Sequence, residues 1–330
     1  MIKDNSVELL FNYIDESTEY IKDKLEISYL EALIETGENF FEGEILQEEI
    51  TDSQKDKLMN TIQQFTSVTK DNESIRRAFQ LAILKGMKQG VQTNHEMTPD
   101  GIAFIISYLV GKLTEGKQEL SILDPAIGTG NLLLTILNSS KEKFTDPIGI
   151  DVDDVLVRIA FVIGNLLGHE IELFNQDSLA PLFVDPVDVV VCDLPVGFYP
   201  NAERAKEYAL KAKEGMSYAH HLFIEQSMNY LKSGGFFISL VPNHLFTSDQ
   251  SGQLQNYINE TGVIQGLIQL PVSAFKDEKH QKSILIIRKN AENMKKPKKA
   301  LLVDFPKLTN MKAVEDIMLQ MNAWFKENLQ

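Results

Sequence analysis

The sequence predicts an α/β protein in which a seven-stranded, mostly parallel sheet follows an all-helical N-terminal domain. Three observations lead to this fold. A strand, a glycine-rich turn and a helix follow one another in residues 121–137. An apolar, β-branched run typical of a central parallel strand occupies residues 187–192. Residues 1–95 instead show apolar side chains at helical spacing, which predicts domains at 1–95 and 96–330.

The N-terminal segment reads as a small, acidic helical domain. Val7, Leu10 and Ile14 recur at helical spacing, and Thr51 stands at a helix start that leads into an apolar periodic stretch. Nothing in this segment names a ligand. Contact with DNA, formation of a homodimer and simple coverage of one side of the core therefore all stay open as its role.

The glycine-rich turn is the strongest local signal in the chain. Asp124-Pro125 ends a buried strand, Gly128-Thr129-Gly130 allows a tight turn, and an apolar helix face follows. Such a corner points backbone N–H groups at a nucleotide ligand. A dinucleotide fingerprint requires a third glycine where this chain has Leu133, and the Gly-Lys-Ser/Thr of a P-loop is missing here.

The stretch from Asp124 to Asn131 closely resembles the first motif of amino-group DNA methyltransferases, which are class I S-adenosylmethionine (SAM) enzymes. This resemblance implies a Rossmann-like SAM-methyltransferase sheet and SAM as the cofactor. Met97-Thr98-Pro99 is similar to the Thr-Pro dipeptide that touches the cofactor in modification subunits of type I restriction systems. The implied cofactor residues in these two stretches are Met97, Thr98, Asp124, Pro125, Ala126, Gly128, Gly130 and Asn131.

Two further acids end predicted strands. Asp151 lies 21 residues after Gly130, where an acid accepts hydrogen bonds from ribose hydroxyls, and Val152 beside it is included as a candidate contact. Asp153 fits a helix cap better than Asp151 does. The resemblance implies that an acid after the third strand faces the adenine amino group of SAM, which makes Asp177 and the adjacent Ser178 candidates.

The fourth predicted strand ends in Asp193-Leu194-Pro195-Val196. Amino methyltransferases carry (Asn/Asp/Ser)-Pro-Pro-(Tyr/Phe/Trp) at this place, and the resemblance implies a catalytic role for Asp193, Leu194 and Pro195. An exocyclic amine is a poor nucleophile because its lone pair is delocalised into the ring. The Asp193 side chain and the Leu194 carbonyl would accept its two hydrogens and so favour a tetrahedral nitrogen.

Val196 stands where the family has an aromatic side chain that stacks on a flipped base. Phe198 or Tyr199 supplies a ring slightly further along the loop. The alternative interpretation is a loop that binds SAM but has lost or changed its methyl acceptor.

The resemblance extends from about Met97 to Arg288, and the order of the motifs matches the γ group of N6-adenine methyltransferases, in particular the bacterial YtxK-like subgroup. It implies SAM-dependent methylation of the adenine N6 amine in DNA. Two alternatives stay open. One is a SAM-binding regulatory or scaffolding protein derived from such an enzyme. The other is a methyltransferase for an RNA, protein or small-molecule amine.

Composition bears on partners and location. The net charge of −15 opposes contact with nucleic acid, although residues 276–300 carry nine basic against three acidic side chains. About 40 residues follow the seventh strand, too few for a target-recognition domain, so a separate specificity subunit is a candidate partner.

The single cysteine and the absence of a signal or membrane-spanning stretch predict a cytoplasmic protein. No metal site is predicted, because the histidines lack partners at metal spacing.

Overall fold

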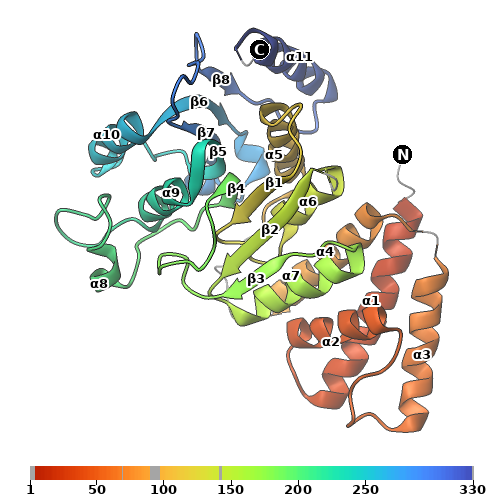
Figure 1. The fold of residues 1–330 in the computed structure, drawn as a ribbon. Helices are drawn as coiled ribbons and strands as arrows, with labels where there is room; N and C mark the ends of the chain where they lie inside the picture. Colours follow the sequence, from red (N-terminus) through yellow and green to blue (C-terminus); the bar gives the residue numbers. More distant parts are fainter. Residues whose placement is uncertain (1–3, 69, 90–96, 141–142, 329–330) are drawn as a thin grey trace.

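The protein is described by a computed structural model that covers residues 4–68, 70–89, 97–140 and 143–328 (Figure 1). An eight-stranded sheet forms the centre, helices cover both of its faces, and a separate group of N-terminal helices packs at one side. The predicted α/β fold with an N-terminal helical domain is therefore confirmed. The boundary predicted between residues 95 and 96 lies outside the described residues.

Within its described residues, the N-terminal domain consists of helices joined by turns and loops and contains no strand. Ser28 and Glu31 form a capping box at the start of one helix, with the Glu31 amide 3.2 Å from the Ser28 hydroxyl. Thr51 starts another helix, as predicted, and its amide donates to the Gln54 side chain at 3.0 Å. The helices are α1 (Asp4–Leu25), α2 (Tyr29–Glu42), α3 (Asp52–Ser67) and α4 (Asn72–Gln89).

The sheet has the strand order β3-β2-β1-β4-β5-β7-β6-β8. β7 runs antiparallel to both of its neighbours, and all other neighbouring pairs are parallel. The sequence of residues 300–306 indicates a further edge strand, and Leu301–Asp304 forms this eighth strand beside β6. The strands are β1 (Leu120–Asp124), β2 (Phe144–Asp151), β3 (Glu172–Asn175), β4 (Val187–Asp193), β5 (Leu231–Pro242), β6 (Gly262–Gln269), β7 (Lys282–Lys289) and β8 (Leu301–Asp304).

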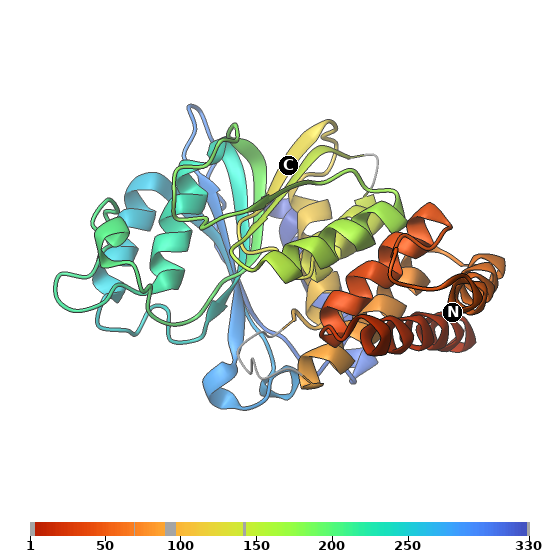
Figure 2. The same cartoon turned by 90° about the horizontal axis from the view of Figure 1, so that it is seen from below.

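Two apolar cores lie on opposite faces of this sheet. One contains side chains of α5, α6 and α11, and the other contains side chains of α9 and α10. Figure 2 shows α9 and α10 on one side of the sheet and α6 and α7 on the other, with the N-terminal helices beyond them. These helices are α5 (Asp100–Leu113), α6 (Asn131–Ser140), α7 (Asp154–Leu167), α9 (Ala219–Asn229), α10 (Ser251–Thr261) and α11 (Met311–Asn328).

The N-terminal domain docks mainly on α7. Side chains of α2 and α4 share a buried apolar cluster with Ile159, Val162 and Ile163. Gly37 of α2 permits this close approach, because a Cβ atom there would lie 2.1 Å from Val162 Cγ1. The helical domain is thus joined to the sheet domain through a packed interface.

One predicted helix is much shorter than expected. The charged sequence of residues 202–214 predicts a helix, but α8 spans only Ala202–Ala205. The Glu225 carboxylate accepts hydrogen bonds from the Ala209 and Leu210 amides at 2.8 and 2.7 Å. Tertiary contacts therefore take donors that a helix would use internally, and the segment forms an irregular loop.

Within the described residues, none of the helices is long and apolar enough to cross a lipid bilayer.

Candidate functional site

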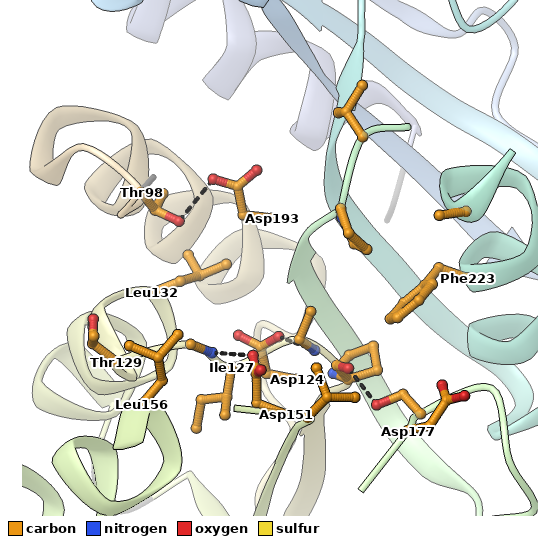
Figure 3. A pocket seen from close by; sticks show the side chains of 18 of the residues that line it. Thr98, Asp124, Ile127, Thr129, Leu132, Asp151, Leu156, Asp177, Asp193 and Phe223 are labelled. Atoms are coloured by element: carbon orange, nitrogen blue, oxygen red, sulfur yellow. Dashed lines mark hydrogen bonds between the residues drawn. The ribbon is translucent and has the colours of Figure 1, made fainter. Parts of the chain in front are cut away.

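A cleft of about 500 Å³ opens at the carboxyl ends of β1, β2 and β4 (Figure 3). β1 and β4 are neighbours in the sheet, and the chain order reverses between them, which is where ligands bind in open α/β folds. Most of the predicted site residues line this cleft. They are Met97, Thr98, Asp124, Pro125, Ala126, Gly128, Asn131, Asp151, Val152, Asp177, Ser178, Asp193, Pro195, Phe198 and Tyr199.

The two glycines of the turn have different roles. Both have positive φ angles, +52° for Gly128 and +82° for Gly130. A Cβ atom on Gly128 would meet nothing within 4 Å, so this position leaves room for a ligand in the cleft. Gly130, also predicted as a cofactor contact, is not among the residues that line the cleft. A Cβ there would lie 3.2 Å from the Ala160 Cβ, so Gly130 allows α6 to pack on α7.

Asp151 ties the glycine turn to the start of α7. Its Oδ2 accepts from the Gly128 amide at 2.9 Å and its Oδ1 from the Asp153 amide at 3.1 Å. Asp153 caps α7 by accepting from the Leu156 amide at 3.2 Å, as predicted. Each Asp151 oxygen can accept a second hydrogen bond, so the carboxylate still has capacity for a ribose hydroxyl.

Asp124 is almost completely buried, with 1% of its surface exposed. Desolvation and, to a smaller extent, the nearby carboxylates of Asp151 and Asp193 raise the pKa of its carboxyl to about 8. The Ala126 amide, which donates to Oδ1 at 3.1 Å, opposes the shift. Figure 3 shows Asp124 beside Asp151 in the floor of the cleft. The floor is therefore acidic and poorly solvated.

The loop after β3 forms hydrogen bonds with the loops that follow β1 and β4. Ser178 donates its hydroxyl to the Pro125 carbonyl, and Asp177 accepts from the Leu179 amide at 2.9 Å. The hydroxyl of Tyr199 donates to the other Asp177 oxygen, and burial raises the pKa of Tyr199. Tyr199 is only 8% exposed, so its ring belongs to the wall of the cleft.

Phe198 is the exposed ring of the two that were predicted, with 52% of its surface accessible. The backbone of its loop pairs with residues 217–219, through Tyr199 N–H to Ser217 C=O at 2.9 Å and Ala219 N–H to Gly197 C=O at 2.8 Å. The Phe198 ring stacks on Tyr218 with centroids 4.9 Å apart. Backbone pairing and stacking thus hold one face of Phe198 in place at the cleft.

Leu194 does not line the cleft, and its side chain is buried in the core under the loop. Its amide donates to the Leu240 carbonyl at 3.2 Å, which extends the β4–β5 pairing by one residue. Cys192, one strand position before Asp193, is buried, and burial raises the pKa of its thiol. The backbone of β4 is therefore fixed up to the start of the cleft loop.

Asp193 is held by two donors from distant parts of the chain. The Thr98 hydroxyl donates to its Oδ2 at 3.0 Å, and the Lys282 ammonium lies 2.5 Å from its Oδ1 (Figure 3 shows the Thr98 contact). Thr98 was predicted only as a cofactor contact. Lys282 was not predicted as a site residue at all. It lies 89 positions from Asp193 and reaches it because β7 begins beside the end of β5.

Several apolar residues of the cleft were also missed by sequence reasoning. Met87 from α4, Leu156 from α7 and Phe223 from α9 all line it. Each falls at helical spacing with neighbouring core positions, so the sequence carries no signal that separates it from ordinary core residues. Together they give the cleft apolar walls above its acidic floor.

The fold is shared with restriction–modification proteins. The methyltransferase subunit of a type I system from Streptococcus thermophilus superposes with a TM-score of 0.64 at 16% identity, over 96% of this chain and 74% of that one. At this identity the likeness concerns the fold alone.

Closer similarity identifies the family. A protein from Listeria monocytogenes, assigned to the class I SAM-dependent methyltransferases, superposes with a TM-score of 0.89 at 43% identity, over 98% of this chain and all of that one. The uncharacterized protein YtxK of Bacillus subtilis (strain 168) is 50% identical over 328 residues, 99% of each chain. Residues 8–87 match the YtxK N-terminal helical domain and residues 87–325 match the N-6 DNA Methylase model. The chain therefore belongs to the N-6 DNA methylase family and carries a YtxK-like helical domain at its N-terminus.

Proposed function

We propose that this chain is a methyltransferase that uses SAM to methylate the exocyclic N6 amine of adenine in DNA. The observation that carries the proposal is the position of Asp193. Its carboxylate ends β4, is held by Thr98 and Lys282, and lines the same cleft as the acidic floor around Asp124. A hydrogen-bond acceptor for the amine thus lies beside the pocket expected for the methyl donor.

The chemistry of the cleft fits SAM. SAM carries positive charge on its sulfonium and ammonium groups, and the carboxylates of Asp151 and Asp177 provide negative charge in the cleft lining. Asp151 and Asp177 are placed to accept from the ribose hydroxyls and the adenine amino group. Leu156 and Phe223 offer apolar surface to the adenine ring. When bound, SAM supplies a methyl group activated by the sulfonium.

The residues of the β4 loop would act on the acceptor. Asp193 accepts hydrogens of the amine, which draws the nitrogen lone pair out of conjugation and toward the methyl group. In this proposal the Leu194 carbonyl accepts the second hydrogen. Thr98 and Lys282 keep the carboxylate in one orientation, so little reorganisation is needed when the amine arrives.

Phe198 takes the stacking role that Val196 cannot fill. Val196 and Phe198 both line the cleft, and Phe198 presents an exposed ring that Tyr218 supports from behind. A flipped adenine stacked on this ring would be held near Asp193. The departure from the family motif is thereby compensated two residues later in the loop.

Replacing Phe198 with alanine is expected to lower kcat/KM for DNA by about 10- to 100-fold, because a base–aromatic stack contributes about 1–3 kcal/mol. The affinity for SAM should change little. Methyl-transfer kinetics against DNA concentration, with calorimetry for SAM, measure both quantities. Phe183→Ala is the matched control, because Phe183 is 90% exposed and does not line the cleft. Equal losses in both variants would rule out the stacking role.

Replacing Lys282 with methionine is expected to lower kcat by roughly 10-fold while leaving the SAM dissociation constant unchanged. Lys282 touches Asp193 but does not line the cleft, so its removal frees the acceptor carboxylate without altering the cofactor walls. Single-turnover transfer and calorimetry separate the two effects. Lys279→Met, on the exposed loop before β7, is the control. A raised SAM dissociation constant with unchanged kcat would contradict this role.

The direct test combines calorimetry with SAM and transfer of tritiated methyl groups to unmethylated DNA. Binding together with label on adenine N6 supports the proposal. Binding without label on DNA favours a regulatory SAM-binding protein, unless RNA, protein or small amines take up the label instead. No binding of SAM would refute the proposal.

Target recognition is assigned in this proposal to a separate subunit. The net charge of −15 disfavours extensive contact of this chain alone with phosphates. The type I modification subunits that share the fold belong to multi-subunit systems, and by analogy a specificity subunit would bring DNA to the cleft. Residues 96–330 would form the catalytic domain, and a DNA acceptor implies that the protein works in the cytoplasm.

A further inference from the structure

Arg76 lies on α4 of the N-terminal helical domain, yet its guanidinium is buried next to the cleft. Nε and Nη2 donate to Glu73 at 2.8 and 2.6 Å. Nη1 donates to Asp100 at 2.9 Å and also to the side-chain oxygen of Asn131. One side chain of the helical domain therefore bonds to the first residues of both α5 and α6.

Two of the three partners of Arg76, Asp100 and Asn131, are themselves joined to a wall of the cleft. The side-chain Nδ2 of Asn131 donates to the Thr98 carbonyl at 2.7 Å and to the Asp100 carboxylate at 3.3 Å. Gln80, one turn further along α4, donates to Asp100 at 2.6 Å. Asn131 and Thr98 both line the cleft, so the contacts of α4 end on residues that face the ligand.

We propose that Arg76 is a positioning residue for SAM, and that the helical domain is a functional part of the cofactor site. The inference rests on the SAM binding of the proposed function, and it does not depend on which acceptor is methylated. The guanidinium fixes the Asn131 side chain, which in turn fixes the segment carrying Thr98. Met87, also from α4, supplies a stretch of the cleft wall directly.

The geometry requires a planar, multidentate cation. Three separate acceptors surround Arg76, and a lysine ammonium is a point charge on a flexible stem that cannot serve all of them in the same arrangement. Because binding and docking share these contacts, they are thermodynamically linked. SAM stabilises the docked helical domain to the same extent that docking strengthens SAM binding.

The test measures SAM dissociation constants by calorimetry on the full chain. Arg76→Met and Arg76→Lys are both expected to weaken binding by about 10- to 100-fold, the range for a lost hydrogen bond to a charged group. Arg77→Met, at the next position of the same helix, should bind like the wild type. A double-mutant cycle combines Arg76→Met with Asn131→Ala. The double variant is expected to bind SAM about as weakly as whichever single variant binds it less tightly, because both substitutions break the same Arg76–Asn131 hydrogen bond.

Loss of folding must be separated from loss of positioning, because Arg76→Met leaves two carboxylates without their cation. A companion variant therefore also carries Glu73→Gln and Asp100→Asn. Its thermal unfolding without SAM is expected to resemble the wild type, while its SAM affinity stays reduced. In the wild type, SAM should also slow amide exchange in α4, and this effect should be lost in the companion variant.

The outcomes separate this inference from the proposed function. Wild-type affinity in Arg76→Met, or additive effects in the cycle, would overturn the role of Arg76 even if DNA is methylated. Binding that depends on Arg76 in a chain that labels no DNA would overturn the proposed acceptor and leave Arg76 in its role. A wild-type chain that does not bind SAM would overturn both.

Discussion

Replacing Asp193 with alanine is expected to reduce methyl transfer by about 10³-fold, because the cleft then lacks the oxygen that polarises the acceptor amine. The dissociation constant for SAM should change by no more than about threefold, since the floor around Asp124 and Asp151 is untouched. Tritiated-methyl transfer under single-turnover conditions measures the first quantity, and calorimetry measures the second.

Asp193→Asn is the informative control for this prediction. Asparagine keeps an acceptor oxygen at the same place and is one of the residues that the family motif allows there, so activity should stay within about 10-fold of the wild type. It loses only the charge that pairs with Lys282 at 2.5 Å. If Asp193→Ala labelled DNA at the wild-type rate, the acceptor would have to be activated elsewhere in the cleft.

Replacing Asp124 with asparagine is expected to stabilise the protein in the absence of ligand, by about 4 kcal/mol at pH 7. Burial raises the pKa of Asp124 from 3.8 to about 8 in the folded protein. Between pH 4 and pH 8 the folded state therefore keeps a proton that the unfolded state has released. The free energy of unfolding falls as pH rises through this window, by at most about 1.4 kcal/mol per unit.

Urea denaturation from pH 5 to pH 9 tests this prediction. The gap between Asp124→Asn and the wild type should widen up to about pH 8 and then stay constant, because Asp124 is ionised in both states above that pH. Asp185→Asn, at an exposed aspartate, should show no such widening. A constant gap across the whole range would mean that Asp124 is already ionised in the folded protein. Above about pH 8, where the folded protein carries Asp124 as a carboxylate, Asp124→Asn should also bind SAM more weakly, because it removes a negative charge from the floor.

The parts of the fold that the sequence predicted correctly depend on local signals. The turn around Gly128 and Gly130, the acid Asp151 after β2 and the apolar run of β4 are each encoded within a dozen residues. Parallel strands bring their carboxyl ends to one edge, so the residues that follow several strands come together there without further information. The cleft residues from Asp124 to Asp193 are largely of this kind.

The residues that were missed depend on long-range packing. Lys282 reaches Asp193 only because β7 inserts between β5 and β6, an order that spacing along the chain does not reveal. Arg76 is an ordinary charged residue in a helix until α4 docks against the start of α6. The choice between Phe198 and Tyr199 likewise follows from the Tyr199 contact with Asp177, which lies 22 residues away.

Because β7 runs antiparallel to its neighbours, the two parts of the cleft are built from different kinds of chain segment. Parallel strands deliver their last residues to the site, whereas β7 delivers its first, Lys282, directly after the loop of residues 270–281. Insertions or deletions in that loop would change the residues beside Asp193 without shifting β1 or β2, whose ends carry several of the residues proposed to bind the cofactor. In the proposed function, a change in this one surface loop would therefore alter the surroundings of the acceptor amine and leave the residues proposed for the methyl donor in place.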